Sequence, residues 1–178
     1  MEARDLAARR GIAIREVAPA EVPQLRDPQQ TVAIGSDHGG YAMKEALKPL
    51  LESLGLTIQD LGVHTPQPAD YPDVALAVAE AVAGGGATRG IIVDGAGIGS
   101  AMAANKVPGI RAALCYDRAS AKNSREHNHA NVLTLGGRLL TESQAEDVVR
   151  TWIATPYGGG RHQGRIDKIT QIERRYSK

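Results

Sequence analysis

The feature that most constrains the fold of this chain is the segment at residues 91–100, which reads IIVDGAGIGS. Three β-branched residues without polar alternation are typical of a buried parallel strand. The glycines permit a tight turn and close approach to a ligand, and residues 100–106 are expected to be helical. A strand, a glycine loop and a helix N-terminus together form a cradle for anions or developing negative charge. Asp94, at the strand end, is interpreted either as a working group of an active site or as a cap that fixes the loop.

Strand and helix patterns alternate along the chain from residue 31 onward. Because helices separate all five predicted strands, the crossovers should be right-handed and the strands parallel. We therefore expect an α/β, Rossmann-like three-layer sandwich with a five-stranded parallel sheet. Strands are predicted at 31–35, 56–61, 89–93, 110–115 and 131–135, and helices at 41–54, 73–83, 100–106, 118–127, 141–154 and from a basic loop at 157–165 to about 175.

Length and charge exclude several classes of protein. The 178 residues form one domain with room for an appendage, and a net charge of +1 argues against a strong nucleic-acid or membrane field. The single cysteine excludes an intrachain disulfide framework and is usual in a reducing compartment. No run approaches the ~20 apolar residues of a membrane span. We expect a cytoplasmic protein that binds neither nucleic acid nor membrane.

Residues 1–30 differ in composition from the domain predicted at 31–178. Charges alternate with alanines at 1–10, and Pro19, Pro23 and Pro28 interrupt the connector that follows. The segment is interpreted either as a loosely packed extension or as a docking or targeting tail that recruits the domain to a partner or a protein shell. It has the composition of neither a transit peptide nor a signal peptide.

Asp37 and His38 follow the first predicted strand and precede two glycines. An imidazole transfers protons near neutral pH and, when charged, binds phosphate. The alternative is that Asp37 caps the next helix while His38 packs in the turn.

His127 and Asn128 close a predicted helix, with His129 at the same corner. His127 is interpreted either as neutralising the helix C-terminal dipole or as opening a sugar ring while Asn128 holds a developing oxyanion. The histidines lack the i, i+4 spacing of helical zinc sites, so no metal site is expected.

Arginines gather on the loops near the end of the chain. A guanidinium suits bidentate phosphate binding, and Arg138, Arg161, His162 and Arg165 are interpreted either as an anion clamp or as a solvated basic face.

Six short motifs occur in one order between about residues 31 and 176. They are GSDHGG at 35–40, DYP at 70–72, GAGIG at 95–99, AANK at 103–106, SREHN at 124–128 and GGRHQ at 159–163. This ordered set resembles the ribose-5-phosphate isomerase B family, which also includes the two galactose-6-phosphate isomerase subunits. The compact members of the family have no counterpart of residues 1–30.

The resemblance implies an aldose–ketose isomerase that needs no cofactor. It also implies a homodimer or tetramer whose sites are built between two subunits. The backbone of the glycine loop would stabilise the enediolate, and the arginines would hold the phosphate, partly from the neighbouring subunit. The substrate-binding residues implied by the resemblance are Asp37, His38, Tyr71, Gly95, Gly97, Ile98, Gly99, Arg138, Arg161 and Arg165.

The catalytic residues implied by the resemblance are Asp94, His127 and Asn128. His127 would promote ring opening with Asn128 beside it. Asp94 stands where well-studied members carry a cysteine base, and Ser100 stands where other members place a glutamate. Carboxylates remove such protons in other isomerases, so Asp94 is the candidate base.

Two functions are therefore expected as alternatives. The first is the isomerisation of a sugar phosphate, ribose 5-phosphate to ribulose 5-phosphate, through an enediolate. The second is a galactose-6-phosphate-type isomerase subunit or a non-catalytic sugar-phosphate-binding partner subunit, because an acid at position 94 also resembles a subunit that works only alongside a partner.

Overall fold

The sheet contains five parallel strands in the order β2-β1-β3-β5-β4. The structure is a computed structural model and describes residues 30–177. The predictions for residues 1–29 therefore lie outside the described residues. The strands are β1 (Thr31–Ser36), β2 (Thr57–Asp60), β3 (Arg89–Asp94), β4 (Ala112–Leu114) and β5 (Val132–Gly136).

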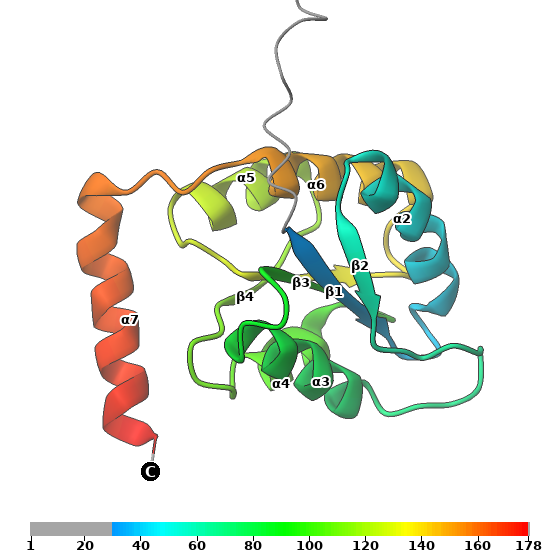
Figure 1. Ribbon diagram of the computed structural model, residues 1–178, viewed down its shortest axis with the longest axis horizontal. Helices are drawn as coiled ribbons and strands as arrows, with labels where there is room; N and C mark the ends of the chain where they lie inside the picture. Colours follow the sequence, from blue (N-terminus) through cyan, green and yellow to red (C-terminus); the bar gives the residue numbers. More distant parts are fainter. Residues whose placement is uncertain (1–29, 178) are drawn as a thin grey trace, which may run out of the picture.

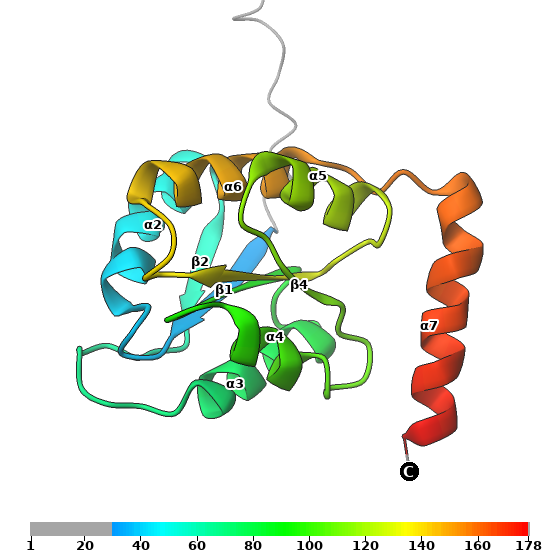
Figure 2. The ribbon, with the colours of Figure 1, turned by 180° about the vertical axis from the view of Figure 1, so that it is seen from behind.

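Helices cover both faces of this sheet, as Figures 1 and 2 show. One layer contains α2, α5 and α6, and the other contains α3 and α4. The predicted three-layer α/β sandwich is confirmed. The helices are α2 (Tyr41–Ser53), α3 (Tyr71–Ala83), α4 (Ile98–Ala104), α5 (Arg118–Glu126), α6 (Glu142–Ala154), the 3-10 turn η2 (Gly160–His162) and α7 (Gln163–Tyr176).

Each central strand contributes side chains to two separate cores. Val32 and Ile34 of β1 belong to the core under α2 and α6, while Ala33 between them faces the core under α3. β3 divides its residues in the same way, because successive side chains of a strand point to opposite faces. A strand that is buried on both faces carries no alternating polar residues. The apolar run at 91–93 therefore identifies β3 as a central strand of the sheet.

Capping boxes fix the start of two helices. The Asp117 carboxylate accepts a hydrogen bond from the amide of Ser120 at 2.7 Å, and the Ser120 hydroxyl oxygen accepts one from the amide of Asp117. Thr141 and Gln144 form the same reciprocal pair before α6. Each pair satisfies amide groups that a helix leaves without an internal partner.

Trp152 of α6 is fully buried and has two arginines near its ring. The guanidinium of Arg125 lies 5.3 Å from the centre of the indole ring and that of Arg89 lies 5.7 Å away. Arg89 also donates to the carbonyl of Ile153 at 2.6 Å. Burial, followed by the charges of Arg89 and Arg111, lowers the pKa of Arg125 to about 10.

Helix α7 stands beside the sandwich instead of packing on it along its length (Figures 1 and 2). Ile166 near its start is buried, whereas Ile169, Ile172 and Tyr176 are exposed. Glu173 accepts a hydrogen bond from the amide of Gly109 at 2.9 Å. No helix in the range 30–177 has the length and apolar character needed to cross a membrane.

Candidate active site

Three loops meet where the strand order reverses. Ser36 at the end of β1 pairs in register with Val93, and Asp94 at the end of β3 pairs with Gly136 at the end of β5. The loops that follow these strands therefore leave the sheet at one edge, which is where open α/β sheets bind ligands. Nine predicted site residues lie at the end of β3, in these loops or at the start of α3 or α4. We call them the carboxyl-edge cluster: Asp37, His38, Tyr71, Asp94, Gly95, Gly97, Ile98, Gly99 and Arg138.

The Asp94 carboxylate is buried and accepts hydrogen bonds from its own loop. Oδ1 accepts from the amides of Ala96, at 2.8 Å, and of Gly97. Oδ2 accepts from the amide of Ser100 at 3.0 Å and from the Ser100 hydroxyl. Four donors fill the acceptor capacity of a carboxylate. This arrangement supports the loop-fixing interpretation of Asp94.

The loop held by Asp94 leads directly into α4. Ile98 and Gly99 are the first residues of that helix, two residues before the predicted start. The amides of a helix's first turn have no internal partner, and here only that of Ser100 is taken by Asp94. The amides of Ile98 and Gly99 are therefore free to donate to an oxygen that gains negative charge.

Asp37 and His38 are held against this loop by short-range contacts. Asp37 is buried, and its Oδ1 accepts a hydrogen bond from the amide of Gly40 at 2.9 Å, so it does fix the turn before α2. His38 is exposed, with Nδ1 3.3 Å from the carbonyl oxygen of Ala69. A Cβ on Gly39 would lie 3.2 Å from the amide nitrogen of Gly95, so the two loops touch through backbone.

Tyr71 and Arg138 border the loop on two sides. Tyr71 is the first residue of α3, and a Cβ on Gly99 would lie 2.5 Å from its ring. The amide of Arg138 donates to the carbonyl of Gly95 at 3.1 Å. Both side chains have exposed surface, so they are available to a ligand at the loop.

The other predicted site residues lie elsewhere in the chain. His127 and Asn128 follow α5 and precede β5, while Arg161 lies in η2 and Arg165 in α7. The amide of Gly158 donates to the carbonyl of Glu126 at 2.9 Å, which brings the loop before η2 to the end of α5. We call His127, Asn128, Arg161, His162 and Arg165 the amino-edge cluster.

His127 is held between a hydrogen bond and an aromatic stack. The side-chain nitrogen of Asn123 lies 2.9 Å from Nδ1 of His127. Because an amide nitrogen only donates, Nδ1 accepts, and the neutral ring carries its hydrogen on Nε2. The ring of His162 stacks on His127 with centroids 4.2 Å apart. The free Nε2–H can therefore donate to a ligand.

His162 is buried, and its Nδ1 has no hydrogen-bond partner among the described residues. Burial, followed by the adjacent His127 imidazole and the charges of Arg161 and Arg165, lowers the pKa of His162. At neutral pH the ring is therefore an uncharged stacking partner for His127.

The two clusters lie at opposite edges of the sheet. β5 separates Asn128 from Arg138, and its five residues span about 15 Å at ~3.3 Å per residue. The predicted clamp of Arg138 with Arg161, His162 and Arg165 is thus not assembled within one chain, because Arg138 follows β5 whereas the other three adjoin residues that precede it.

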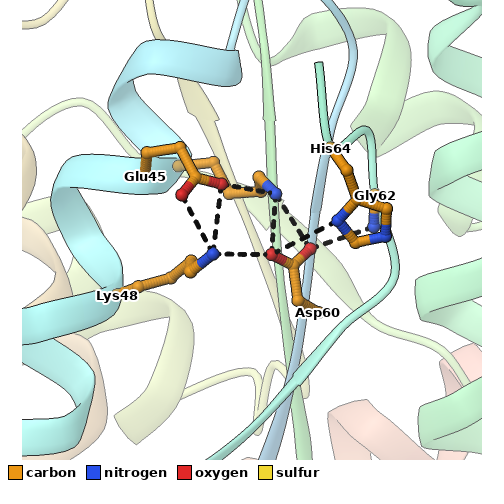
Figure 3. A network of polar contacts seen from close by, with 6 residues as sticks. Glu45, Lys48, Asp60, Gly62 and His64 are labelled. Atoms are coloured by element: carbon orange, nitrogen blue, oxygen red, sulfur yellow. Dashed lines mark hydrogen bonds and ion pairs between the residues drawn. The ribbon is translucent and has the colours of Figure 1, made fainter.

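Sequence reasoning overlooked Asn123 and a buried ion network. Asn123 stands four residues before His127 on a helix, and this i, i+4 spacing indicates the contact. The network joins Lys44, Glu45, Lys48 and Asp60 (Figure 3). No group of three or more His, Cys, Asp or Glu residues within 30–177 is arranged to hold a metal ion.

Known proteins resemble the chain over almost all of its described part. The profile of the family described as Ribose/Galactose Isomerase matches residues 32–169. Ribose-5-phosphate isomerase B of Escherichia coli is 42% identical over 81% of this chain and 97% of its own length. D-erythrulose-4-phosphate isomerase of Pectobacterium atrosepticum is 37% identical over 80% of this chain and 95% of its own.

A solved structure agrees with these sequence relatives. The ribose-5-phosphate isomerase B of Clostridium thermocellum superposes with a TM-score of 0.82 at 48% identity. The match covers 83% of this chain and all of the other. Sequence and fold therefore indicate the same relatives.

Proposed function

This chain belongs to the ribose/galactose isomerase family, and we propose from that premise that it interconverts ribose 5-phosphate and ribulose 5-phosphate. The observation that carries the proposal is the glycine loop at the end of β3, which adjoins Tyr71 and Arg138 and leaves the amides of Ile98 and Gly99 without a backbone partner among the described residues. Relatives named for this reaction match the whole domain.

Aldose–ketose isomerisation moves one proton between C2 and C1 through an enediolate. The negative charge develops on the oxygens of these two carbons, so donors fixed in advance lower the barrier. The amides of Ile98 and Gly99 supply such donors. Asp37, His38 and Tyr71 would bind the sugar hydroxyls beside them.

Asp94 holds the loop in this proposal, and it is also the candidate base that takes the proton from C2 and returns it to C1. Taking a proton from carbon would require one of its oxygens to release a donor, since four hydrogen bonds already occupy them. Holding the loop amides in place needs no such change. Fixed geometry of this kind is what makes oxyanion donors effective.

Ring opening and phosphate binding use the amino-edge cluster of a second copy of the chain. His127 has a free Nε2–H to give to a ring oxygen, and Arg161 and Arg165 are exposed guanidiniums suited to phosphate. About 15 Å of sheet separates this cluster from the glycine loop of the same chain. A dimer in which the amino-edge cluster of one chain meets the glycine loop of the other would bring the two together.

Helix α7 supports this arrangement. Its exposed Ile169, Ile172 and Tyr176 border a cavity of about 690 Å³ between the helix and the edge of the sandwich. A row of apolar side chains beside such a cavity is expected to be covered by protein. A second copy would bury this row while bringing its amino-edge cluster to the glycine loop.

The deciding experiment is an assay of the pure protein against four-, five- and six-carbon aldose phosphates. We expect turnover of ribose 5-phosphate, with deuterium from the solvent appearing at the carbon that exchanges its proton. The tetrose phosphates belong in the panel because one relative is named for erythrulose 4-phosphate. Binding of sugar phosphates without turnover would contradict the proposal and support the non-catalytic partner subunit. A cytoplasmic location and recruitment through residues 1–30 stay predictions.

A further inference from the structure

An ion network joins α2 to the end of β2 through residues that belong to neither cluster (Figure 3). Nζ of Lys44 donates to both oxygens of Asp60 at 2.9 and 2.8 Å and lies 2.9 Å from Glu45. Nζ of Lys48 lies 2.9 Å from both Asp60 and Glu45. Two ammonium groups and two carboxylates thus alternate around a closed ring.

The inner half of this network is costly to build. The Lys44 side chain is fully buried and that of Asp60 is 17% exposed, whereas Lys48 and Glu45 are 30% and 38% exposed. Burial alone would raise the pKa of Asp60, but hydrogen bonds from Lys44, Lys48 and the amide of Gly62 outweigh it and hold that pKa at about 2. Apolar residues in place of a buried ion pair often stabilise a fold equally well, so stability does not explain the pair.

The pair connects through backbone to the residue before Asp37. Oδ1 of Asp60 accepts from the amide of Gly62 at 3.0 Å. The carbonyl of Gly62 accepts from the amide of Ser36 at 2.6 Å, and the amide of Val63 donates to the carbonyl of Ser36 at 2.7 Å. The start of the β2–α3 loop, residues 61–70, is thereby fixed against the end of β1, directly before Asp37 and His38.

The far end of the same loop reaches two of the proposed sugar-binding residues. Ala69 contacts Nδ1 of His38 through both its carbonyl and its amide, at 3.3 and 3.4 Å. Asp70 is the N-cap of α3, and Tyr71 is the first residue of that helix. The placement of His38 and Tyr71 therefore depends on where residues 61–70 lie.

We propose that Lys44 and Asp60 are positioning residues that hold the β2–α3 loop so that His38 and Tyr71 meet the sugar. This inference rests on the proposed function for its consequence in catalysis. The ordering of the loop itself is a separate property and can be measured without substrate.

The test compares two double variants of equal charge. Lys44→Met/Asp60→Ala removes the buried pair, and methionine retains most of the volume of the lysine stem. Glu45→Gln/Lys48→Met removes the exposed pair of the same network and is the matched control. The measurements are KM and kcat for ribose 5-phosphate, the unfolding midpoint, and amide hydrogen exchange of residues 61–70 and of β3.

For the buried-pair variant we expect KM to rise about tenfold, which corresponds to the loss of roughly one well-placed hydrogen bond. The kcat should stay within about twofold of the wild-type value. Exchange in residues 61–70 should be about tenfold faster while that of β3 is unchanged. The control should match the wild type in all of these. A population of unfolded protein lowers the apparent kcat and leaves KM alone, so the rise in KM separates positioning from stability.

Two results would overturn the inference. One is a folded buried-pair variant whose KM and loop exchange match the wild type. The other is a variant that fails to fold or exchanges faster throughout the sheet, because the pair would then stabilise the whole domain. An inactive wild-type protein would contradict the proposed function alone, and loop exchange would still decide the positioning role.

Discussion

The carboxyl-edge and amino-edge clusters are held by different kinds of interaction. Carboxylates fix the first: Asp94 binds its loop and Asp37 binds the turn before α2. Aromatic rings hold the second, where His162 stacks on His127 and Tyr157 stacks on His129 at 4.4 Å. The first is a rigid surface for developing charge, and the second presents an imidazole and guanidiniums outward. The difference fits the proposed dimer, in which each chain supplies one half of each of two sites.

The largest expected effect comes from separating the halves genetically. The variants His38→Ala/Tyr71→Ala and His127→Ala/Arg161→Ala should each lose activity about a hundredfold or more, since each removes one half of every site. Co-expression of both should restore about a quarter of wild-type activity, because half of the dimers are mixed and each has one intact site.

Co-expression of two different carboxyl-edge variants is the matched control and should restore nothing. If co-expression of the carboxyl-edge variant with the amino-edge variant also restores no activity, the two clusters do not form a site shared between subunits.

A second prediction concerns how Asp94 holds the carboxyl edge. Asp94→Asn puts an amide donor where a buried carboxylate now accepts four hydrogen bonds. Because such bonds contribute about 1.5–3 kcal/mol each, we expect the unfolding midpoint to fall by roughly 5–10 °C. Turnover should fall about a hundredfold in the same variant.

Ser100→Ala removes only the hydroxyl donor, so its unfolding midpoint and its turnover should both fall less than those of Asp94→Asn. If Asp94→Asn keeps its unfolding midpoint and loses only turnover, Asp94 is the base and its hydrogen bonds yield during the reaction.

The smallest expected effect concerns pH and the amino edge. The pKa of His162 is lowered in the folded chain, so the unfolded chain takes up that proton first, and the stability contributed by His162 is lost as the pH falls below about 6.5. Asp60 should add nothing to the pH dependence in this range, since its pKa is about 2 and the stability it contributes is lost only below about pH 4.

His162→Phe keeps an aromatic ring against His127 and removes the titration. Calorimetry between pH 7.5 and 5.5 should show a midpoint that depends less on pH in the variant, by about 1–2 °C. Equal pH dependence in the two proteins would show that His162 does not make the amino edge sensitive to acid.

Much of this organisation is predictable from sequence because it follows from local patterns. The apolar run at 91–93 and the glycines after Asp94 locate β3 and the loop correctly. The helix containing Tyr71 begins two residues earlier than predicted, because Pro72 is well tolerated in a first turn. The separation of the two clusters can also be predicted from the sequence, since His127 precedes a predicted strand and Arg138 follows it.

The buried network lies beyond such reasoning. Lys44 occurs in a helix whose charged residues look solvated, and its partner Asp60 is sixteen residues away. Local patterns give neither the depth of a side chain nor its distant partners. Similarly, the composition of the loop leaves both roles of Asp94 open; the four hydrogen bonds show that it fixes the loop, and its role as the base stays a prediction.

The burial of Trp152 beside Arg89 and Arg125 has a practical consequence. It is the protein's only tryptophan, so all indole emission comes from one enclosed position beneath the amino edge. An indole shielded from water emits at short wavelength and shifts to longer wavelength when the chain opens. Tryptophan fluorescence therefore reports the opening of the chain around Trp152. A ligand that binds at the glycine loop should leave the emission wavelength unchanged.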